Sequence, residues 1–217
     1  MKIIPLLVAA IILSSSAFGQ KPTPTPVSQP FLMAVEDVFY INGRGLIATG
    51  KIERGTLKVG DAVEIVGGKA TKPATVSAIE MFRKMVDEAK AGDNVGVLLR
   101  GVEKTDVERG QILAKPGSIA SHTKFKAKID LTPAAEGGRK MPIASGFRPQ
   151  VIIRTASFTG TLILAAGKAQ AAAGDTAVEV EIELTQPAAL EKGQVVTLRE
   201  FGKTIASGVV TAVTPSK

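Results

Sequence analysis

The fold is decided by one stretch, NGRGLIATGKIERGTLKVGD, which covers residues 42–61. Its five glycines argue against a helix, because glycine is a poor helix former and tolerates the positive φ angles of tight turns. The run between them, residues 46–52, contains β-branched residues that favour a strand. We therefore predict turn, strand, turn, short strand and turn, a pattern typical of closed antiparallel barrels.

The same stretch nearly matches a nucleotide-binding phosphate loop. Residues 45–52 fit the pattern G-x-x-x-x-G-K-[ST] up to the last position, where Ile52 replaces the hydroxyl that would hold Mg²⁺. A helix should follow such a loop, whereas Glu53-Arg54-Gly55 turns the chain. We therefore interpret the match as a barrel strand and expect no nucleotide cofactor.

Composition narrows the chemistry further. The 217 residues include no Cys and a single histidine, His122, which excludes disulfides, thiolate metal sites, cysteine nucleophiles and His-rich metal sites. The net charge of +7 permits weak attraction to nucleic acid or anionic surfaces, but no run of consecutive basic residues marks a nucleic-acid arm. No nucleophile with its base is recognisable, so we predict no enzyme activity, no catalytic residues, and no cofactor or metal.

The N-terminus has the features of a secretory signal peptide. Met1-Lys2 precedes an apolar run, residues 3–13, and small residues at Ala17 and Gly19 mark a cleavage site before Gln20. The apolar run is shorter than the roughly 20 residues that span a bilayer, so we expect no transmembrane span after cleavage. We predict an exported protein, whether periplasmic, cell-surface or secreted; an uncleaved N-terminal anchor is the alternative.

The remainder of the chain alternates short β-rich runs with turns. The dipeptide Gly-Asp introduces a strand three times, at Gly60, Gly92 and Gly174. Residues 178–184 alternate strictly between apolar residues and three glutamates, which indicates a solvated strand face rather than a cation site. We predict an all-β fold with two Greek-key-type antiparallel β-barrels in tandem. The expected units are a signal peptide (1–19), a disordered Pro/Thr-rich linker (20–30), a first barrel (31–119) and a second barrel (120–217).

Several specific runs carry a resemblance to a known family. They include EDVF at 36–39, GRG at 43–45, VEIVG at 63–67, EMFRK at 80–84, NVGVLLRG at 94–101, RPQ at 148–150 and TGT at 159–161. On these runs, the chain from Phe31 onward resembles domains two and three of bacterial translation elongation factor Tu. The resemblance is dense in the first predicted barrel and looser in the second, where loops 140–145 and 165–173 differ and Phe201 stands where the family usually has Gly.

The resemblance implies a pocket in the first barrel that binds the aminoacylated 3′ end of transfer RNA. Apolar residues would face a terminal base and an acyl chain, Glu80 would accept from a ribose hydroxyl, and Arg83 would offer a charged fork. The alternative is that these residues persist because the barrel needs them. The matching positions are Ile41, Gly43, Ile47, Glu80, Arg83, Asn94 and Leu98.

Two further positions, Gln150 and Arg154, match the part of the family's second barrel that touches the RNA stem and the GTPase domain. The sequence contains no intact phosphate loop, Asn-Lys-x-Asp signature or switch region, so we expect no GTP hydrolysis. Two functions therefore stay open. One is an exported, non-catalytic binding module with an unknown protein or envelope ligand as partner. The other is an elongation factor-like protein that binds the 3′ end of aminoacyl-tRNA.

Overall fold

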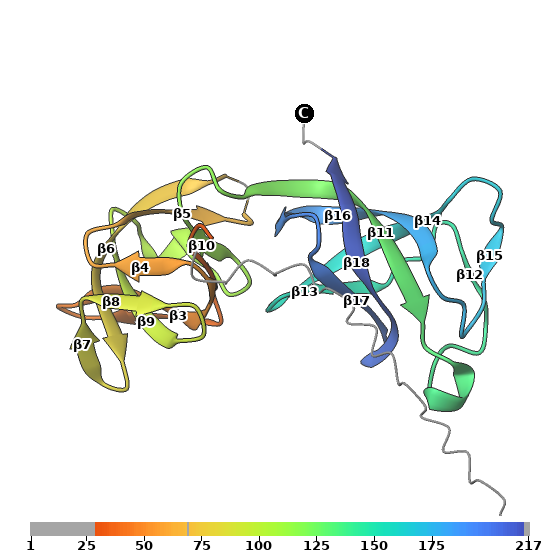
Figure 1. Ribbon diagram of the computed structural model, residues 1–217, viewed down its shortest axis with the longest axis horizontal. Helices are drawn as coiled ribbons and strands as arrows, with labels where there is room; N and C mark the ends of the chain where they lie inside the picture. The colour runs from red at the N-terminus through yellow and green to blue at the C-terminus, as the bar shows by residue number, and fades with distance from the viewer. Residues whose placement is uncertain (1–28, 69, 215–217) are drawn as a thin grey trace, which may run out of the picture.

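The chain forms two closed antiparallel β-barrels in tandem, which confirms the predicted fold class (Figure 1). A computed structural model describes residues 29–68 and 70–214. The predicted signal peptide, and all of the predicted linker before Gln29, lie outside these residues. In the described part of the chain, no helix has the length and apolar character needed to cross a membrane.

The first barrel closes through six strands in the order β1-β10-β5-β6-β9-β3, with β3 pairing back onto β1. β2 pairs with β3 and β7 with β6 outside this ring, while β4 and β8 form a separate pair. The single-turn helix η2 (Lys104–Asp106) precedes β10. The strand bounds are β1 Leu32–Ala34, β2 Asp37–Ile41, β3 Gly45–Arg54, β4 Thr56–Lys58, β5 Ala62–Val66, β6 Lys72–Met81, β7 Lys84–Val86, β8 Glu88–Lys90, β9 Asn94–Arg100 and β10 Ile112–Ala114.

The stretch at residues 42–61 lies at the centre of this barrel. β3 is longer than predicted, because its first half pairs with β2 and β9 and its second half reaches β1. Gly50 permits this crossing, since a Cβ at this position would lie 2.0 Å from the carbonyl oxygen of Ala34. Ile52, the residue that breaks the phosphate-loop pattern, is fully buried in the core.

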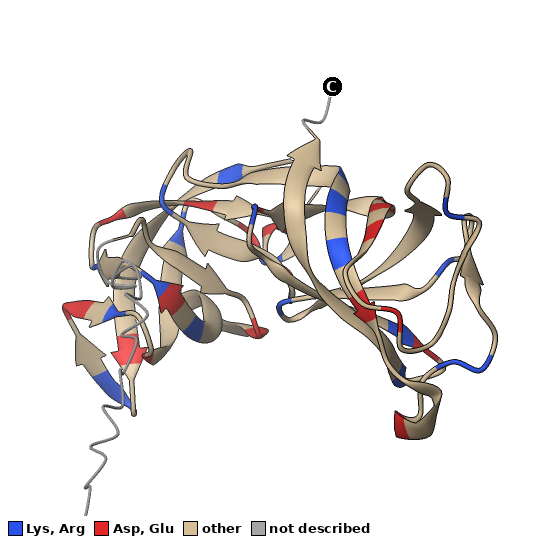
Figure 2. Cartoon of the chain, turned by 45° about the vertical axis from the view of Figure 1, so that its right-hand side comes forward, with Lys and Arg blue, Asp and Glu red and all other residues tan. Residues whose placement is uncertain are grey.

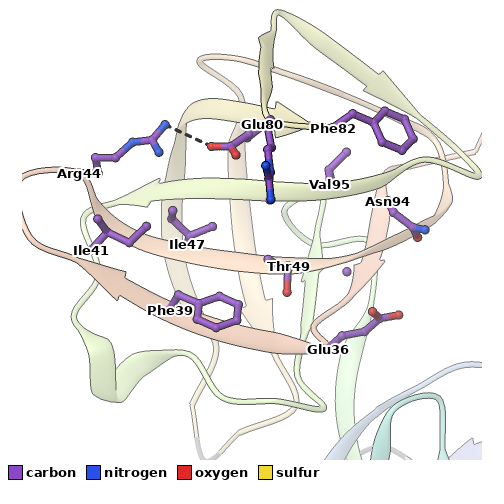
Figure 3. A pocket seen from close by; sticks show the side chains of 13 residues that line it. Glu36, Phe39, Ile41, Arg44, Ile47, Thr49, Glu80, Phe82, Asn94 and Val95 are labelled. Carbon is purple, nitrogen blue, oxygen red and sulfur yellow. Dashed lines mark hydrogen bonds and ion pairs between the residues drawn. The ribbon is translucent and has the colours of Figure 1, made fainter.

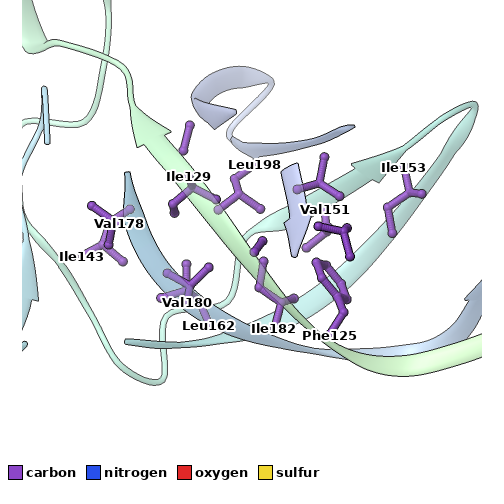
Figure 4. Close-up of a cluster of buried hydrophobic side chains, with 14 of the residues drawn as sticks. Phe125, Ile129, Ile143, Val151, Ile153, Leu162, Val178, Val180, Ile182 and Leu198 are labelled. Atoms are coloured by element: carbon purple, nitrogen blue, oxygen red, sulfur yellow. The ribbon is translucent and has the colours of Figure 1, made fainter. Parts of the chain in front are cut away.

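The second barrel closes through β11-β16-β14-β13-β17-β18, with β18 pairing onto β11. Its core contains Phe125, Leu162 and Ile182, which are fully buried (Figure 4). The bounds are β11 Ala120–Leu131, η3 Ala134–Glu136, β12 Ile143–Ala144, β13 Gln150–Ile153, β14 Ala156–Leu164, β15 Gln170–Ala171, β16 Val178–Leu190, β17 Val195–Glu200 and β18 Lys203–Thr214.

The alternating run at residues 178–184 lies in β16, with its apolar side in the core and its glutamates outside. In the register of β11 and β16, lysines lie directly opposite these glutamates (Lys and Arg positions are blue and Asp and Glu positions red in Figure 2). Lys124 Nζ lies 3.6 Å from Glu181 and 3.4 Å from Glu183, and Lys128 Nζ lies 3.4 Å from Glu179. These partly exposed pairs are typical of a solvated sheet face and contribute little stability.

Candidate functional site

A hollow of about 460 Å³ opens on the first barrel (Figure 3). It is formed by β2, β3, the start of β9 and the turn between β6 and β7. The lining residues are Glu36, Phe39, Ile41, Arg44, Ile47, Thr49, Gly50, Glu80, Phe82, Arg83, Asn94, Val95 and Gly96. They combine apolar side chains with charged and amide groups, a composition typical of ligand sites.

The apolar part of the hollow comes from neighbouring strands. Phe39 pairs directly with Ile47 across β2 and β3, and Ile41 follows on the same face of β2. Ile47 is buried, whereas Phe39 keeps 53% of its surface exposed and Ile41 is also exposed. This leaves an accessible apolar surface beside a buried support, which suits a flat ring or an aliphatic chain.

The polar rim contains one ion pair and one unpaired cation. Arg44 Nη2 donates to Glu80 Oε2 at 3.2 Å, and both side chains stay partly exposed (Figure 3). Arg83 forms no ion pair with any residue of the described chain. The rim therefore offers a free guanidinium group to an anionic or carbonyl-bearing ligand.

The turn between β6 and β7 brings Phe82 and Arg83 to the hollow. Met81 pairs with Lys84, so these two residues alone reverse the chain, and both have positive φ angles of 50° and 62°. Such angles are unfavourable for side chains other than Gly, Asn and Asp. Phe82 is 86% exposed, so burial does not compensate for this strain.

Five of the seven residues that the resemblance assigned to the first-barrel pocket line this hollow, namely Ile41, Ile47, Glu80, Arg83 and Asn94. The other two do not. Leu98 is buried and lies directly opposite Ile47 on the neighbouring strand β9, so its side chain is on the same face of the sheet as Ile47 but does not line the hollow. Gly43 lies in the turn before β3, with φ of 79°.

The hollow also contains residues that our sequence prediction did not include. Glu36 directly precedes β2, Phe39 lies in β2 and Thr49 lies in β3. Arg44 and Phe82 come from turns. Phe39 and Ile41 have the period-two spacing of one strand face, which could have linked them to Ile47. No sequence pattern indicated that Arg44 would pair with Glu80, which is 36 residues away.

The two residues predicted in the second barrel have different surroundings. Gln150 is exposed at the start of β13. The side chain of Arg154 is 4% exposed and lies where the two barrels meet. It donates through Nε to Glu53 at 2.9 Å, through Nη2 to Glu191 at 2.9 Å and through Nη1 to the carbonyl oxygen of Ala189 at 3.1 Å. Glu191 also accepts two hydrogen bonds from Arg54, at 2.7 and 2.8 Å.

A second cleft, of about 850 Å³, lies between the barrels and includes Asp106 on its first-barrel side. The pKa of Asp106 is lowered, first by the hydrogen bond that it accepts from the backbone N–H of Glu103 and then by its hydrogen bond with Lys72. The described residues contain no group of three or more His, Asp or Glu side chains placed to hold a metal ion.

Two protein-family models match the chain. Residues 45–114 match elongation factor Tu domain 2, and residues 118–214 match the elongation factor Tu C-terminal domain. The first match ends at the last residue of β10, and the second spans all six strands of the second barrel ring.

Proposed function

Residues 45–114 belong to the elongation factor Tu domain 2 family and residues 118–214 to the elongation factor Tu C-terminal domain family, and we propose that this pair of barrels acts as an exported, non-catalytic binding module. The hollow of the first barrel is its binding site. The observation that carries this proposal is the hollow itself, where exposed Phe39 and Ile41 lie beside the unpaired Arg83. The partner is a protein or envelope ligand with an apolar group next to an anionic or carbonyl group.

The non-catalytic part of the proposal rests on residue chemistry. The chain has no Cys, and its only histidine, His122, points a ring nitrogen at the carbonyl oxygen of Thr214, 3.0 Å away. His122 does not line the hollow. The hydroxyl of Thr49, which lines the hollow, donates to the carbonyl oxygen of Asp37 at 3.3 Å and not to a base, so it lacks the arrangement of a triad nucleophile. Export rests on the signal-peptide features of residues 1–19.

A blocking variant tests the binding site. Asn94→Trp places a large ring in the hollow at an exposed position whose side chain makes no hydrogen bond in the described chain. Val195→Trp is the matched control, since Val195 is an exposed strand residue of the other barrel. Purified wild-type protein should retain a ligand from envelope extract that the control also retains and that Asn94→Trp loses by about tenfold or more. If no ligand follows this pattern, the hollow is not the binding site.

Export has its own test. Cell fractionation with N-terminal sequencing of the recovered protein should find it outside the cytoplasm with a sequence that starts at Gln20. Recovery in the cytoplasm with Met1 still present would contradict export but not binding in the hollow. The two parts of the proposal can therefore fail separately.

A second candidate function is binding of the aminoacylated 3′ end of transfer RNA. It is favoured by one observation, that five of the seven residues carried over from the family line the same hollow. Filter binding at low salt distinguishes it, because the resemblance predicts tighter binding of aminoacylated than of uncharged transfer RNA. Equal retention of both forms by wild-type protein and by Asn94→Trp would exclude this function.

A further inference from the structure

We propose that two hairpin tips, Phe82-Arg83 and Phe201-Gly202, anchor the protein at two points on an anionic lipid bilayer. This inference goes beyond the proposed function, because Phe201 belongs to the second barrel and does not line the hollow. It assigns the protein a surface on which to reside, separate from the ligand that it binds.

The first observation is the same unfavourable turn in both barrels. Met81 pairs with Lys84 and Glu200 with Lys203, so each hairpin reverses through two residues. Both central residues have positive φ in each turn, with 50° at Phe82 and 48° at Phe201. Turns of this kind strongly prefer Asn or Gly at the first central position, where each of these hairpins has Phe. Turn chemistry therefore does not explain either phenylalanine.

The second observation is their exposure. Phe82 is 86% exposed and Phe201 is 96% exposed, the two highest values among the exposed large hydrophobic residues of the described chain. Each phenylalanine therefore has two costs in free energy: backbone strain at its positive φ, and the exposure of an apolar ring to water. Insertion into the interfacial region of a bilayer removes the exposure to water, and the protruding hairpin allows the ring to reach that region.

The third observation is the charge beside each ring. Arg83 and Lys84 follow Phe82, and Lys203 follows Phe201 after one residue. None of these three cations forms an ion pair within the described chain, so all are available to lipid phosphates. The acidic neighbour Glu200 faces Arg139 instead, at 3.5 Å. An aromatic tip with free basic flanks suits an anionic bilayer.

The fourth observation is direction. The β6–β7 and β17–β18 hairpins point toward the same, lower side of the molecule in Figure 1. Both tips therefore face the same side of the molecule, and the unpaired Arg83, Lys84 and Lys203 flank them.

The absence of tryptophan from the chain makes a local test possible. Phe82→Trp and Phe201→Trp each introduce a single reporter at a tip. Val195→Trp is the matched control, since Val195 is 59% exposed at the opposite end of β17. The probe is a vesicle of equimolar phosphatidylglycerol and phosphatidylcholine. Because the readout is local, association through the apolar residues 3–13 does not imitate tip insertion.

Both tip reporters should shift their emission to shorter wavelength with vesicles and should be quenched by brominated lipid, whereas the reporter of the Val195→Trp control should do neither. Phe82→Ala or Phe201→Ala should each weaken vesicle partitioning by about tenfold, and added salt should weaken it further. Unchanged emission at both tips, or an equal shift in the control, would overturn the proposal. Because Phe82 and Arg83 also line the hollow, the Phe201 reporter is the one that separates bilayer insertion from ligand binding, which Asn94→Trp tests.

Discussion

The two predicted site arginines occupy similar turns but very different surroundings. Arg83 and Arg154 each lie in a two-residue hairpin turn and each has a positive φ, of 62° and 51°. Arg83 is exposed and unpaired at the rim of the hollow, whereas the side chain of Arg154 is 4% exposed and forms ion pairs with Glu53 and Glu191. The comparison shows that an arginine in a strained turn is available to a ligand only where the fold leaves its donors free.

The largest expected effect is the loss of stability on removing Arg154, the arginine with the buried side chain. Arg154→Ala leaves Glu191 and Glu53 without the guanidinium that joins them across the barrels, and the free energy of unfolding should fall by about 2–3 kcal/mol. Urea denaturation measures the loss. Arg83→Ala is the control and should change stability by less than about 0.5 kcal/mol. Similar losses in both variants would remove the distinction between the two arginines.

A glycine pair extends the comparison to the backbone. At Gly110, with φ of 92°, a Cβ would lie 2.6 Å from Cβ of Ala156 in the other barrel, so Gly110→Ala should cost about 2 kcal/mol. Gly43, with φ of 79°, has nothing within 4 Å, so Gly43→Ala should cost only about 1 kcal/mol from backbone strain. The midpoints of urea denaturation, compared at an unchanged m-value, report both losses in the free energy of unfolding. Equal midpoints would show that the barrels separate easily enough to admit the extra methyl group.

A smaller effect concerns the ion pairs themselves. A double-mutant cycle on Arg44 and Glu80, which stay partly exposed at the hollow, should give a coupling free energy of about 0.2–1 kcal/mol. The same cycle on Arg154 and Glu191 should exceed it, because Arg154 is shielded from solvent. The prediction fails if the exposed pair couples as strongly as the buried one.

The smallest effect depends on pH. The pKa of Asp106 is lowered from 3.8 by the N–H of Glu103 and by Lys72, so its carboxylate stabilises the fold above its unfolded pKa. This stabilisation is lost as the pH falls through the lower folded pKa. The melting temperature of Asp106→Asn should therefore decline less steeply than that of wild type below about pH 3.8. If the melting temperatures of wild type and Asp106→Asn declined equally steeply, these contacts would not lower the pKa of Asp106.

Local sequence patterns predicted the fold well, because barrel strands are marked by alternating apolar residues and by glycine-containing turns. The run at residues 178–184 became β16 with the expected faces, and the glycine-rich stretch became β3 with its flanking turns. The site was harder to predict, because its properties depend on contacts far apart in sequence. Arg154 meets Glu53 across 101 residues, and no pattern around either residue indicates this pairing. The exposure of Phe82 likewise depends on where its hairpin protrudes.

Site-specific photo-crosslinking in living cells tests the central claim most directly, namely that the hollow binds the natural partner. A photoreactive amino acid at position 94 would lie in the hollow, and one at position 195 would lie at an exposed position of the other barrel. The proposed site predicts a discrete covalent adduct from position 94 and none from position 195. Adducts of equal yield at both positions, or none at position 94, would contradict it.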